Sequence, residues 1–203
     1  MIAVIDYGVG NLFSLSASLN YLGLNNVITA DKAEIKNASH IILPGVGAFK
    51  DAYKKLEDTS LIPVIKEEAA NGKPLLGICL GMQLLFDKSY EYGEFEGLKL
   101  IHGEIVPIKD YIGDNLKVPH MGWNSLKITK PSPIFKYIES GDYVYYVHSY
   151  FAKTNEENII ATSDYGIDLT GAASRANVYG TQFHPEKSGK TGLNILKAFS
   201  EIK

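Results

Sequence analysis

The residue with the clearest chemical potential in this chain is its only cysteine. Cys79 ends an apolar run within Gly77-Ile78-Cys79-Leu80-Gly81, and a helical apolar pattern follows at 84–86. A sharp strand-to-helix turn of this kind, a nucleophile elbow, lifts a side chain clear of the sheet, and glycines tolerate its strained backbone and close packing. The helix N-terminus favours thiolate over thiol, and the Leu80 N–H can face an oxyanion. The pattern favours a cysteine nucleophile over the alternative, a small buried hydrophobe.

A thiol nucleophile needs a base, and His184 is the best placed of the five histidines. It follows the apparent strand at 178–183 and precedes a proline and Glu186. Residues two apart in an extended chain face the same way, so Glu186 can hydrogen-bond the imidazole and fix its tautomer. The pattern predicts a Cys-His-Glu triad, with a surface capping turn as the alternative for the His-Pro-Glu segment. His40 and His102 lie in β runs without a carboxylate at useful spacing, and we expect them to be structural.

Glycine-rich turns offer a further place for chemistry. The segment Gly45-Val46-Gly47 follows an apolar run at 40–43, and its backbone N–H groups could cradle an anion. The alternative is an ordinary connection between a strand and a helix. Gly8 and Gly10 lack the third glycine of a dinucleotide fingerprint, because Phe13 occupies that position. We therefore expect no NAD binding, and the chain has no Walker A sequence.

The elements that must position these residues alternate in the first half of the chain. Leucines recur at steps of three and four from Leu12 to Leu22, just before Gly23, which is the apolar stripe of a helix. Strands are expected at 2–5, 27–29, 40–43 and 74–79, with further helices at 48–56 and 61–70. The alternation predicts βαβ units, a parallel sheet and a triad assembled at strand ends.

The second half of the chain has a different sequence pattern. Apolar β-rich runs separated by turn residues occur at 100–108, 125–129, 143–150, 158–163 and 178–183. These runs could form an antiparallel extension of the sheet. Ile195, Phe199 and Ile202 stand at helical spacing and predict a helix that closes over the sheet. We expect one α/β domain over 1–203, with a central mostly parallel sheet flanked by helices and an antiparallel β-rich extension.

Composition excludes several classes of protein. The chain has 203 residues, 45% of them hydrophobic, and a formal net charge of −3. This is ordinary globular composition and predicts no general affinity for nucleic acid or anionic membranes. One cysteine cannot form an internal disulfide, and no Cys/His cluster has zinc spacing. Without a basic leader or a long apolar run, we expect a cytoplasmic, metal-free protein.

Two segments together carry a family resemblance. Gly77-Ile78-Cys79-Leu80-Gly81-Met82-Gln83 and Gln182-Phe183-His184-Pro185-Glu186-Lys187-Ser188 resemble the paired motifs of class I, triad-type glutamine amidotransferases. Other segments resemble the glutaminase subunits of imidazole glycerol phosphate synthase, namely Asp6-Tyr7-Gly8-Val9-Gly10-Asn11, Leu43-Pro44-Gly45-Val46-Gly47-Ala48-Phe49, Pro119-His120-Met121-Gly122-Trp123-Asn124 and Val147-His148-Ser149-Tyr150. The resemblance covers nearly the whole chain and implies the flavodoxin-like fold of class I amidotransferases.

The resemblance also implies roles for individual residues. Cys79 would be the nucleophile, His184 the acid and base, and Glu186 its orienter. The implied glutamine-binding residues are Gln83, His148, Ser149 and Tyr150, and the implied oxyanion hole comprises Gly45, Val46, Gly47 and Leu80. Glutamine would be hydrolysed to glutamate and ammonia through a thioester, without a metal or an organic cofactor.

The resemblance further implies a partner. In the family, ammonia passes to a (β/α)8-barrel cyclase subunit of the same heterodimer. The cyclase converts phosphoribulosylformimino-AICAR ribonucleotide to imidazole glycerol phosphate and AICAR in histidine biosynthesis. Asn11, Trp123 and Lys187 fall where family members meet the cyclase. Their alternative roles are a helix N-cap, a core aromatic and a solvated lysine.

Three other functions fit part of the pattern. An amidotransferase subunit could feed a different synthase, such as one that aminates surface sugars. A stand-alone cysteine hydrolase or chaperone of related fold would have an elbow cysteine but a different acidic partner, and the spacing of His184 and Glu186 argues against it. A non-catalytic interaction module would have no need to keep Cys79, His184, Glu186 and Gln83 together.

Overall fold

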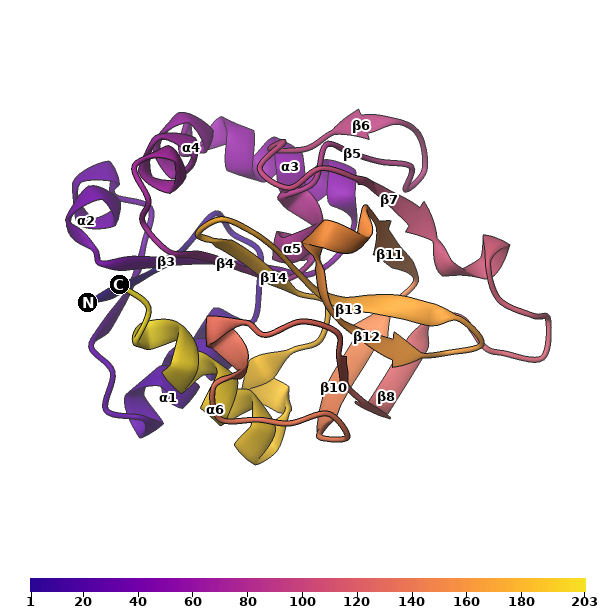
Figure 1. Cartoon of the computed structure of the whole chain (residues 1–203). Coiled ribbons are helices and arrows are strands. Elements are labelled where there is room, and N and C mark those ends of the chain that lie inside the picture. The colour runs from indigo at the N-terminus through magenta and orange to yellow at the C-terminus, as the bar shows by residue number, and fades with distance from the viewer.

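An eight-stranded mixed sheet forms the centre of the molecule, as a computed structural model of residues 1–203 shows (Figure 1). From one edge to the other, its strands are β2 (Asn26–Thr29), β1 (Ile2–Ile5), β3 (His40–Gly45), β4 (Leu75–Cys79), β14 (Val178–Thr181), β13 (Asp168–Arg175), β12 (Ile159–Asp164) and β9 (Lys127–Ile128). The first five are parallel to one another, and the last three continue the sheet in antiparallel order. The predicted α/β class, with a mostly parallel sheet and an antiparallel second half, is confirmed.

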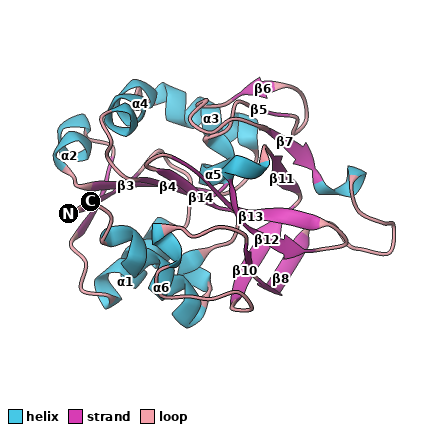
Figure 2. Ribbon diagram, viewed as in Figure 1, coloured by secondary structure: helices cyan, strands magenta, loops and turns pink.

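Helices cover both faces of the parallel strands (Figures 1 and 2). On one face lie α2 (Lys32–Asn37), α3 (Phe49–Asp58) and α4 (Ile62–Ala70), and on the other lie α1 (Leu12–Tyr21) and α6 (Gly189–Ser200). The apolar stripes explain this placement: Leu15 and Leu19 of α1 and Ile195 of α6 share one buried cluster. Burial of such stripes is the main force that docks amphipathic helices on a sheet.

Two smaller sheets stand beside the central one, at the end to which the strands β4 and β14 run (Figure 2). One has the order β11 (Tyr150–Lys153), β7 (Glu104–Pro107), β5 (Lys88–Ser89) and β6 (Phe95–Glu96), and the other pairs β10 (Tyr143–His148) with β8 (His120–Ser125). Single 3₁₀ turns occur as η1 (Ile108–Asp110), η2 (Pro133–Phe135), η3 (Glu156–Asn158) and η4 (Pro185–Lys187). None of the helices combines the length and the apolar character needed to span a membrane.

Several predicted boundaries in the second half were wrong. The run at 143–150 is broken at Ser149, because β10 and β11 belong to different small sheets. The run at 100–108 is a strand only over β7, so His102 lies in the loop before this strand rather than in it. The run at 125–129 divides between β8 and β9, and β14 is parallel to β4 instead of belonging to the antiparallel part.

Helix predictions were closer, with three differences. The helix after Cys79, α5 (Leu80–Leu84), has five residues and stops before the predicted 84–86 segment ends. The C-terminal helix ends at Ser200, so Ile202 packs on the core from beyond it. The third difference is the short helix α2, which was not predicted. Among the strands, β5, β6 and β13 were not predicted either. His40 has the structural role expected of it. Its Nε2 donates a hydrogen bond to the Ile202 carbonyl at 2.9 Å.

Candidate active site

Cys79 lies at the carboxyl end of β4, and α5 starts with the very next residue. Its backbone has φ +54° and ψ −111°, a combination that L-residues rarely adopt. Such a conformation costs about 1–3 kcal/mol and persists only where the surrounding structure imposes it. The predicted elbow is therefore present, and its strain lies on the cysteine itself.

The glycines beside Cys79 permit close packing. A Cβ on Gly81 would lie 1.8 Å from the Leu43 carbonyl oxygen, and a Cβ on Gly77 would lie 2.7 Å from backbone atoms of Met82. Neither glycine has a positive φ. Of the two roles expected for them, only close packing is observed: α5 can sit directly on β3 and β4 because both glycines lack a side chain.

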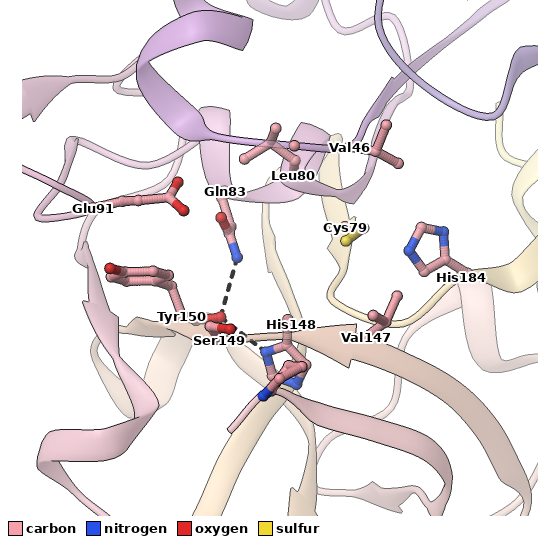
Figure 3. Close-up of a pocket in the computed structure, with 12 residues that line it drawn as sticks. Val46, Cys79, Leu80, Gln83, Glu91, Val147, His148, Ser149, Tyr150 and His184 are labelled. Carbon is pink, nitrogen blue, oxygen red and sulfur yellow. Dashed lines mark hydrogen bonds between the residues drawn. The ribbon is translucent and has the colours of Figure 1, made fainter. Parts of the chain in front are cut away.

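His184 and Glu186 form the hydrogen bond that their spacing predicted. His184 Nδ1 donates to Glu186 Oε1 at 2.8 Å, and both side chains are buried. The contact forms on the 3₁₀ turn η4, however, and not on an extended segment. Because Nδ1 carries the proton toward Glu186, Nε2 is the nitrogen available for catalysis. His184 Nε2 has no hydrogen-bond partner within the protein, and the ring lies beside the sulfur of Cys79 (Figure 3).

The charges around His184 favour the protonated form of its ring. Burial opposes protonation of His184, but the adjacent Cys79 sulfur and the Glu186 carboxylate outweigh it and raise the pKa of His184 above its ordinary value. An imidazolium between a thiolate and a carboxylate is the arrangement that activates a cysteine nucleophile. The three side chains can therefore hold and return a proton at the sulfur.

A cavity of about 310 Å³ opens in front of Cys79. Nine of its twelve lining residues were predicted as site residues: Val46, Gly47, Cys79, Leu80, Gln83, His148, Ser149, Tyr150 and His184. The other three are Glu91, Pro119 and Val147. Gly45 and Glu186 border a smaller hollow behind the triad, together with Asn11. The structure thus brings the predicted catalytic, oxyanion and substrate residues to one place.

Gln83 is held rigidly at the wall of this cavity. Its Nε2 donates to the Tyr150 carbonyl at 3.1 Å (Figure 3) and to Gln182 Oε1 at 3.1 Å. Both amide hydrogens are thereby used, while Gln83 Oε1 makes no hydrogen bond within the protein. His148 also supports this wall, because its Nδ1 donates to the same Tyr150 carbonyl at 2.8 Å. Gln83 Oε1 is therefore free to accept a hydrogen bond from a ligand.

Glu91 is a site residue that sequence reasoning missed. It lies in the turn between β5 and β6, lines the cavity, and accepts a hydrogen bond from the Phe49 N–H at 2.6 Å. Burial raises the pKa of Glu91, and the Phe49 amide opposes that rise. Nothing in the local segment Tyr90-Glu91-Tyr92 distinguishes this carboxylate from a surface one. Only the fold places this carboxylate near the side-chain amide of Gln83 at the cavity (Figure 3).

The predicted oxyanion segment is held in place at Gly45 but has open space around Gly47. Gly45 pairs with Cys79 across β3 and β4, and a Cβ on it would lie 2.7 Å from the Gly81 nitrogen. Tyr7 Oη donates to the preceding Pro44 carbonyl at 2.7 Å and secures the strand end. Beyond it, Val46 is 42% exposed, and Gly47 has φ +95° with open space around its Cα. Any peptide rotation is thus confined to the part after Gly45.

The three predicted interface residues lie around the triad but outside the main cavity. Asn11 occupies the N-cap position of α1 without capping it through its side chain. Trp123 is 55% exposed, so the alternative of a core aromatic was wrong. Lys187 is exposed, with its Nζ 5.8 Å from the centre of the Tyr145 ring, and Trp123 packs edge-on against the same ring at 6.1 Å. Trp123 and Lys187 therefore belong to one surface.

Comparison with known proteins identifies the family. The family model for "Glutamine amidotransferase class-I" matches residues 3–201. The imidazole glycerol phosphate synthase subunit HisH of Caldanaerobacter subterraneus is 51% identical over 203 residues, covering 100% of this chain and 98% of that protein. The HisH subunit of Lacticaseibacillus casei is 54% identical over 202 residues, covering 100% and 96%.

Solved structures agree on the fold. A chain in the structure described as PurLQS from Thermotoga maritima superposes with a TM-score of 0.73 at 19% identity, covering 98% of this chain and 96% of that one. At that identity the likeness concerns the fold alone. The identity to the HisH proteins is far higher and spans both chains end to end, which favours their synthase over any other partner reaction. The chain therefore belongs to the class I glutamine amidotransferases and, within them, to the HisH glutaminase subunits of imidazole glycerol phosphate synthase.

Proposed function

We propose that this chain hydrolyses glutamine in the cavity in front of Cys79. The thiolate attacks the carbonyl carbon of the side-chain carboxamide and forms a tetrahedral oxyanion. His184 gives its Nε2 proton to the nitrogen, the carbon–nitrogen bond breaks, and ammonia leaves a thioester on Cys79. Water then attacks the thioester while His184 takes up its proton. The thioester breaks, glutamate leaves, and the thiolate–imidazolium pair is restored.

The observation that carries this proposal is the alignment of the three side chains. Glu186 fixes the proton of His184 on Nδ1, which leaves Nε2 beside the sulfur of the strained elbow residue Cys79. A structural histidine would instead use both ring nitrogens in hydrogen bonds, as His40 does. The buried, unpartnered Nε2 is explained by a reacting atom that takes its place during turnover.

The walls of the cavity suit the amino-acid end of glutamine. The Glu91 carboxylate and the free Gln83 Oε1 are acceptors for the α-ammonium group. The Ser149 hydroxyl, on the opposite wall beside Tyr150, is a donor for the α-carboxylate. A ligand held at these points directs its carboxamide toward Cys79. The Leu80 N–H and the segment Gly45-Val46-Gly47 then supply the oxyanion hole.

We further propose that the ammonia goes to a (β/α)8-barrel cyclase subunit in a heterodimer. That cyclase combines it with phosphoribulosylformimino-AICAR ribonucleotide and releases imidazole glycerol phosphate and AICAR, in the cytoplasm. The surface that contains Trp123 and Lys187, with Asn11 beside the triad, supports docking on this side of the molecule. Delivery at this side keeps ammonia out of bulk solvent.

Labelling with a glutamine-analogue electrophile tests the site. The complex with the cyclase is treated until glutamine hydrolysis stops and is then digested for mass spectrometry. The adduct is expected on Cys79, and glutamine present during treatment is expected to protect it. An inhibited sample with unmodified Cys79 would contradict the proposed nucleophile. Ammonia-dependent cyclisation by the labelled complex is expected to continue, since that chemistry belongs to the cyclase.

A further inference from the structure

Two buried histidines face each other beside the glutamine cavity. His120 on β8 and His148 on β10 are paired across the two strands, and His120 Nδ1 lies 2.9 Å from His148 Nε2. His148 lines the cavity, whereas His120 does not. The reaction proposed above uses neither ring as an acid or a base. Their contact therefore calls for another explanation.

The hydrogen bonds around the pair fix the position of every proton. His148 Nδ1 lies 2.8 Å from the Tyr150 carbonyl, which can only accept, so Nδ1 carries a proton. A neutral His148 then has a bare Nε2, and His120 Nδ1–H must donate to it. A neutral His120 in turn has a bare Nε2, which receives Asn124 Nδ2 at 3.2 Å. The hydrogen bonds all point the same way, from Asn124 to Tyr150.

Other contacts support these assignments. Asn124 Nδ2 also donates to the Asp164 carbonyl at 2.8 Å, which fixes the orientation of the amide. The His120 ring is stacked between Tyr146 and Tyr165, with ring centres 4.6 and 4.1 Å away. Burial lowers the pKa of His120 to about 4 and that of His148 to about 3, so both rings are neutral at pH 7. No carboxylate contributes to either value.

The series ends on the carbonyl that also positions Gln83. Tyr150 O accepts from both His148 Nδ1 and Gln83 Nε2, so the position of that oxygen determines how Gln83 presents its free Oε1 (Figure 3). We propose that Asn124 and His120 are positioning residues for glutamine turnover, because they hold His148 in the one tautomer that anchors the Tyr150 carbonyl. The proposal rests on the proposed binding of glutamine beside Gln83.

The series of hydrogen bonds starts at Asn124 on β8, and one side of this strand is exposed. Along β8, His120 is buried and Asn124 is partly buried, while the alternating residues Met121 and Trp123 are 61% and 55% exposed. Alternate residues of a strand point to opposite sides. A partner that contacts Met121 and Trp123 therefore contacts the strand that carries His120 and Asn124. The hydrogen bonds from Asn124 through His120 and His148 connect that strand to the glutamine cavity.

An isosteric substitution that reverses one hydrogen bond tests the proposal. In Asn124→Asp, a carboxylate replaces the amide donor, so His120 must now donate from Nε2. His120 is buried, with His148, Tyr146 and Tyr165 the titratable groups against its ring, so it is expected to stay neutral and lose the Nδ1 proton. His148 then changes tautomer as well and releases the Tyr150 carbonyl. Nitrogen NMR of the histidine rings at pH 7 is expected to show both tautomer changes. An imidazolium His120 beside an unchanged His148, together with a raised KM, would overturn the proposal.

Kinetics of the complex with the cyclase provide the functional readout. Loss of one buried hydrogen bond corresponds to roughly a tenfold effect, so KM for glutamine is expected to rise about tenfold in Asn124→Asp with kcat little changed. Asn194→Asp is the matched control, since Asn194 Nδ2 also donates to a backbone carbonyl but lies on α6. It is expected to leave KM unchanged.

A second variant separates positioning from stability. Asn124→Leu removes the same hydrogen bonds without forcing His120 to donate, so its KM is expected to rise less than that of Asn124→Asp, even where it is the less stable protein. If KM follows the free energy of unfolding across both variants, or if the His120 and His148 resonances are unchanged in Asn124→Asp, the proposal is wrong. Failure of the proposed function would look different: glutamine would not protect Cys79 from labelling in the unmodified protein.

Discussion

Gln83 and Gln182 lie 99 positions apart in the chain and hydrogen-bond through their buried side-chain amides at 3.1 Å. Gln182 Nε2 in turn lies 3.8 Å from Cys79 Sγ, within hydrogen-bonding reach of sulfur. Gln83 follows the nucleophile and Gln182 precedes the histidine His184, so this contact ties the two catalytic segments together. The triad is thus preformed in the isolated chain, and control of activity is expected in a different part of the site.

The first prediction concerns the role of the sulfur. Cys79→Ser is expected to lower glutamine hydrolysis by at least about a thousandfold, because a hydroxyl at this position is a far weaker nucleophile than a thiolate. Cyclisation with added ammonia and binding to the cyclase are expected to persist. Parallel assays of the complex with glutamine and with an ammonium salt measure both. Loss of both reactions together would point to misfolding instead of a lost nucleophile.

The strained backbone at the elbow gives a second prediction. Glycine adopts the Cys79 conformation of φ +54° and ψ −111° without the steric penalty of a Cβ. Cys79→Gly is therefore expected to be more stable than Cys79→Ala by about 1 kcal/mol, although both are inactive. Urea unfolding of the two variants provides the comparison. A less stable glycine variant would show that the elbow is not strained.

The third prediction separates the roles of His184 and Glu186. Glu186→Gln keeps an acceptor for His184 Nδ1 but removes the charge that stabilises the imidazolium, and it places an amide where the buried Glu186 Oε2 has no partner. We expect glutamine turnover to fall by about tenfold to a hundredfold in Glu186→Gln and by more in His184→Ala, which removes the acid and base itself. Equal losses in the two variants would contradict this division of roles.

Gly47 provides the fourth prediction, about control of activity: we expect binding of the cyclase to rotate the neighbouring Gly45–Val46 peptide and turn the Val46 N–H toward the oxyanion. Its φ of +95° penalises alanine, while the open space around it excludes a clash. Gly47→Ala is expected to change the ratio of cyclase-stimulated to basal glutamine hydrolysis by about tenfold or more, because an oxyanion donor is worth roughly 10²–10³ in rate. Binding to the cyclase is expected to stay the same.

Gly72→Ala is the matched control for this variant. Gly72 also has a positive φ, +89°, with nothing near its Cα, but it lies in the turn between α4 and β4, away from the cavity. Glutamate release is measured for the free chain, the complex, and the complex with a cyclase ligand. Gating through rotation of the Gly45–Val46 peptide, which carries the Val46 N–H, is ruled out if Gly47→Ala and Gly72→Ala give the same activity ratio, or if the unmodified free chain is fully active.

The buried histidine His148 predicts acid sensitivity. Burial lowers its pKa to about 3 in the folded protein, below the unfolded value, so its contribution to stability is present above pH 6.5 and declines as the pH falls toward 3. Lowering the pH from 7 to 5 is expected to cost about 2 kcal/mol of unfolding free energy through this residue alone. Urea unfolding at the two pH values measures it. An equal free energy at both values would contradict a buried neutral His148.

Much of this architecture follows from the sequence, and the omissions have physical reasons. Strands at 2–5 and 40–43 are buried on both faces and read as continuous apolar runs. The strand β13 is buried over its central residues 169–173, but its sequence Asp-Leu-Thr-Gly-Ala-Ala-Ser-Arg is dominated by small residues, so it has little β propensity. The helix α2 has six residues and one buried side chain, Ile35, which is too little to show a period.

The site residues also divide into those that the sequence could predict and those that it could not. Cys79 and His184 each lie within a local pattern of glycines, proline and apolar strand residues, so their positions could be inferred. Glu91, His120 and Asn124 acquire their roles through contacts between segments far apart in the chain. His120, for instance, meets His148 only because β8 and β10 pair in one register. No local pattern encodes such a contact.

The placement of β14 between β4 and β13 has a consequence for the order of folding. The strands β1 to β4 come from the first 79 residues and need only short connections, whereas β14 begins at Val178 and pairs directly with β4. Contacts of such large sequence separation form slowly, because a long loop must close first. A growing chain that has not reached Val178 exposes β4 as an open edge, and its cysteine has no base. Catalytic competence therefore requires that β14 has paired with β4 and brought His184 to Cys79, and a chain that ends before Val178 has no triad to release ammonia.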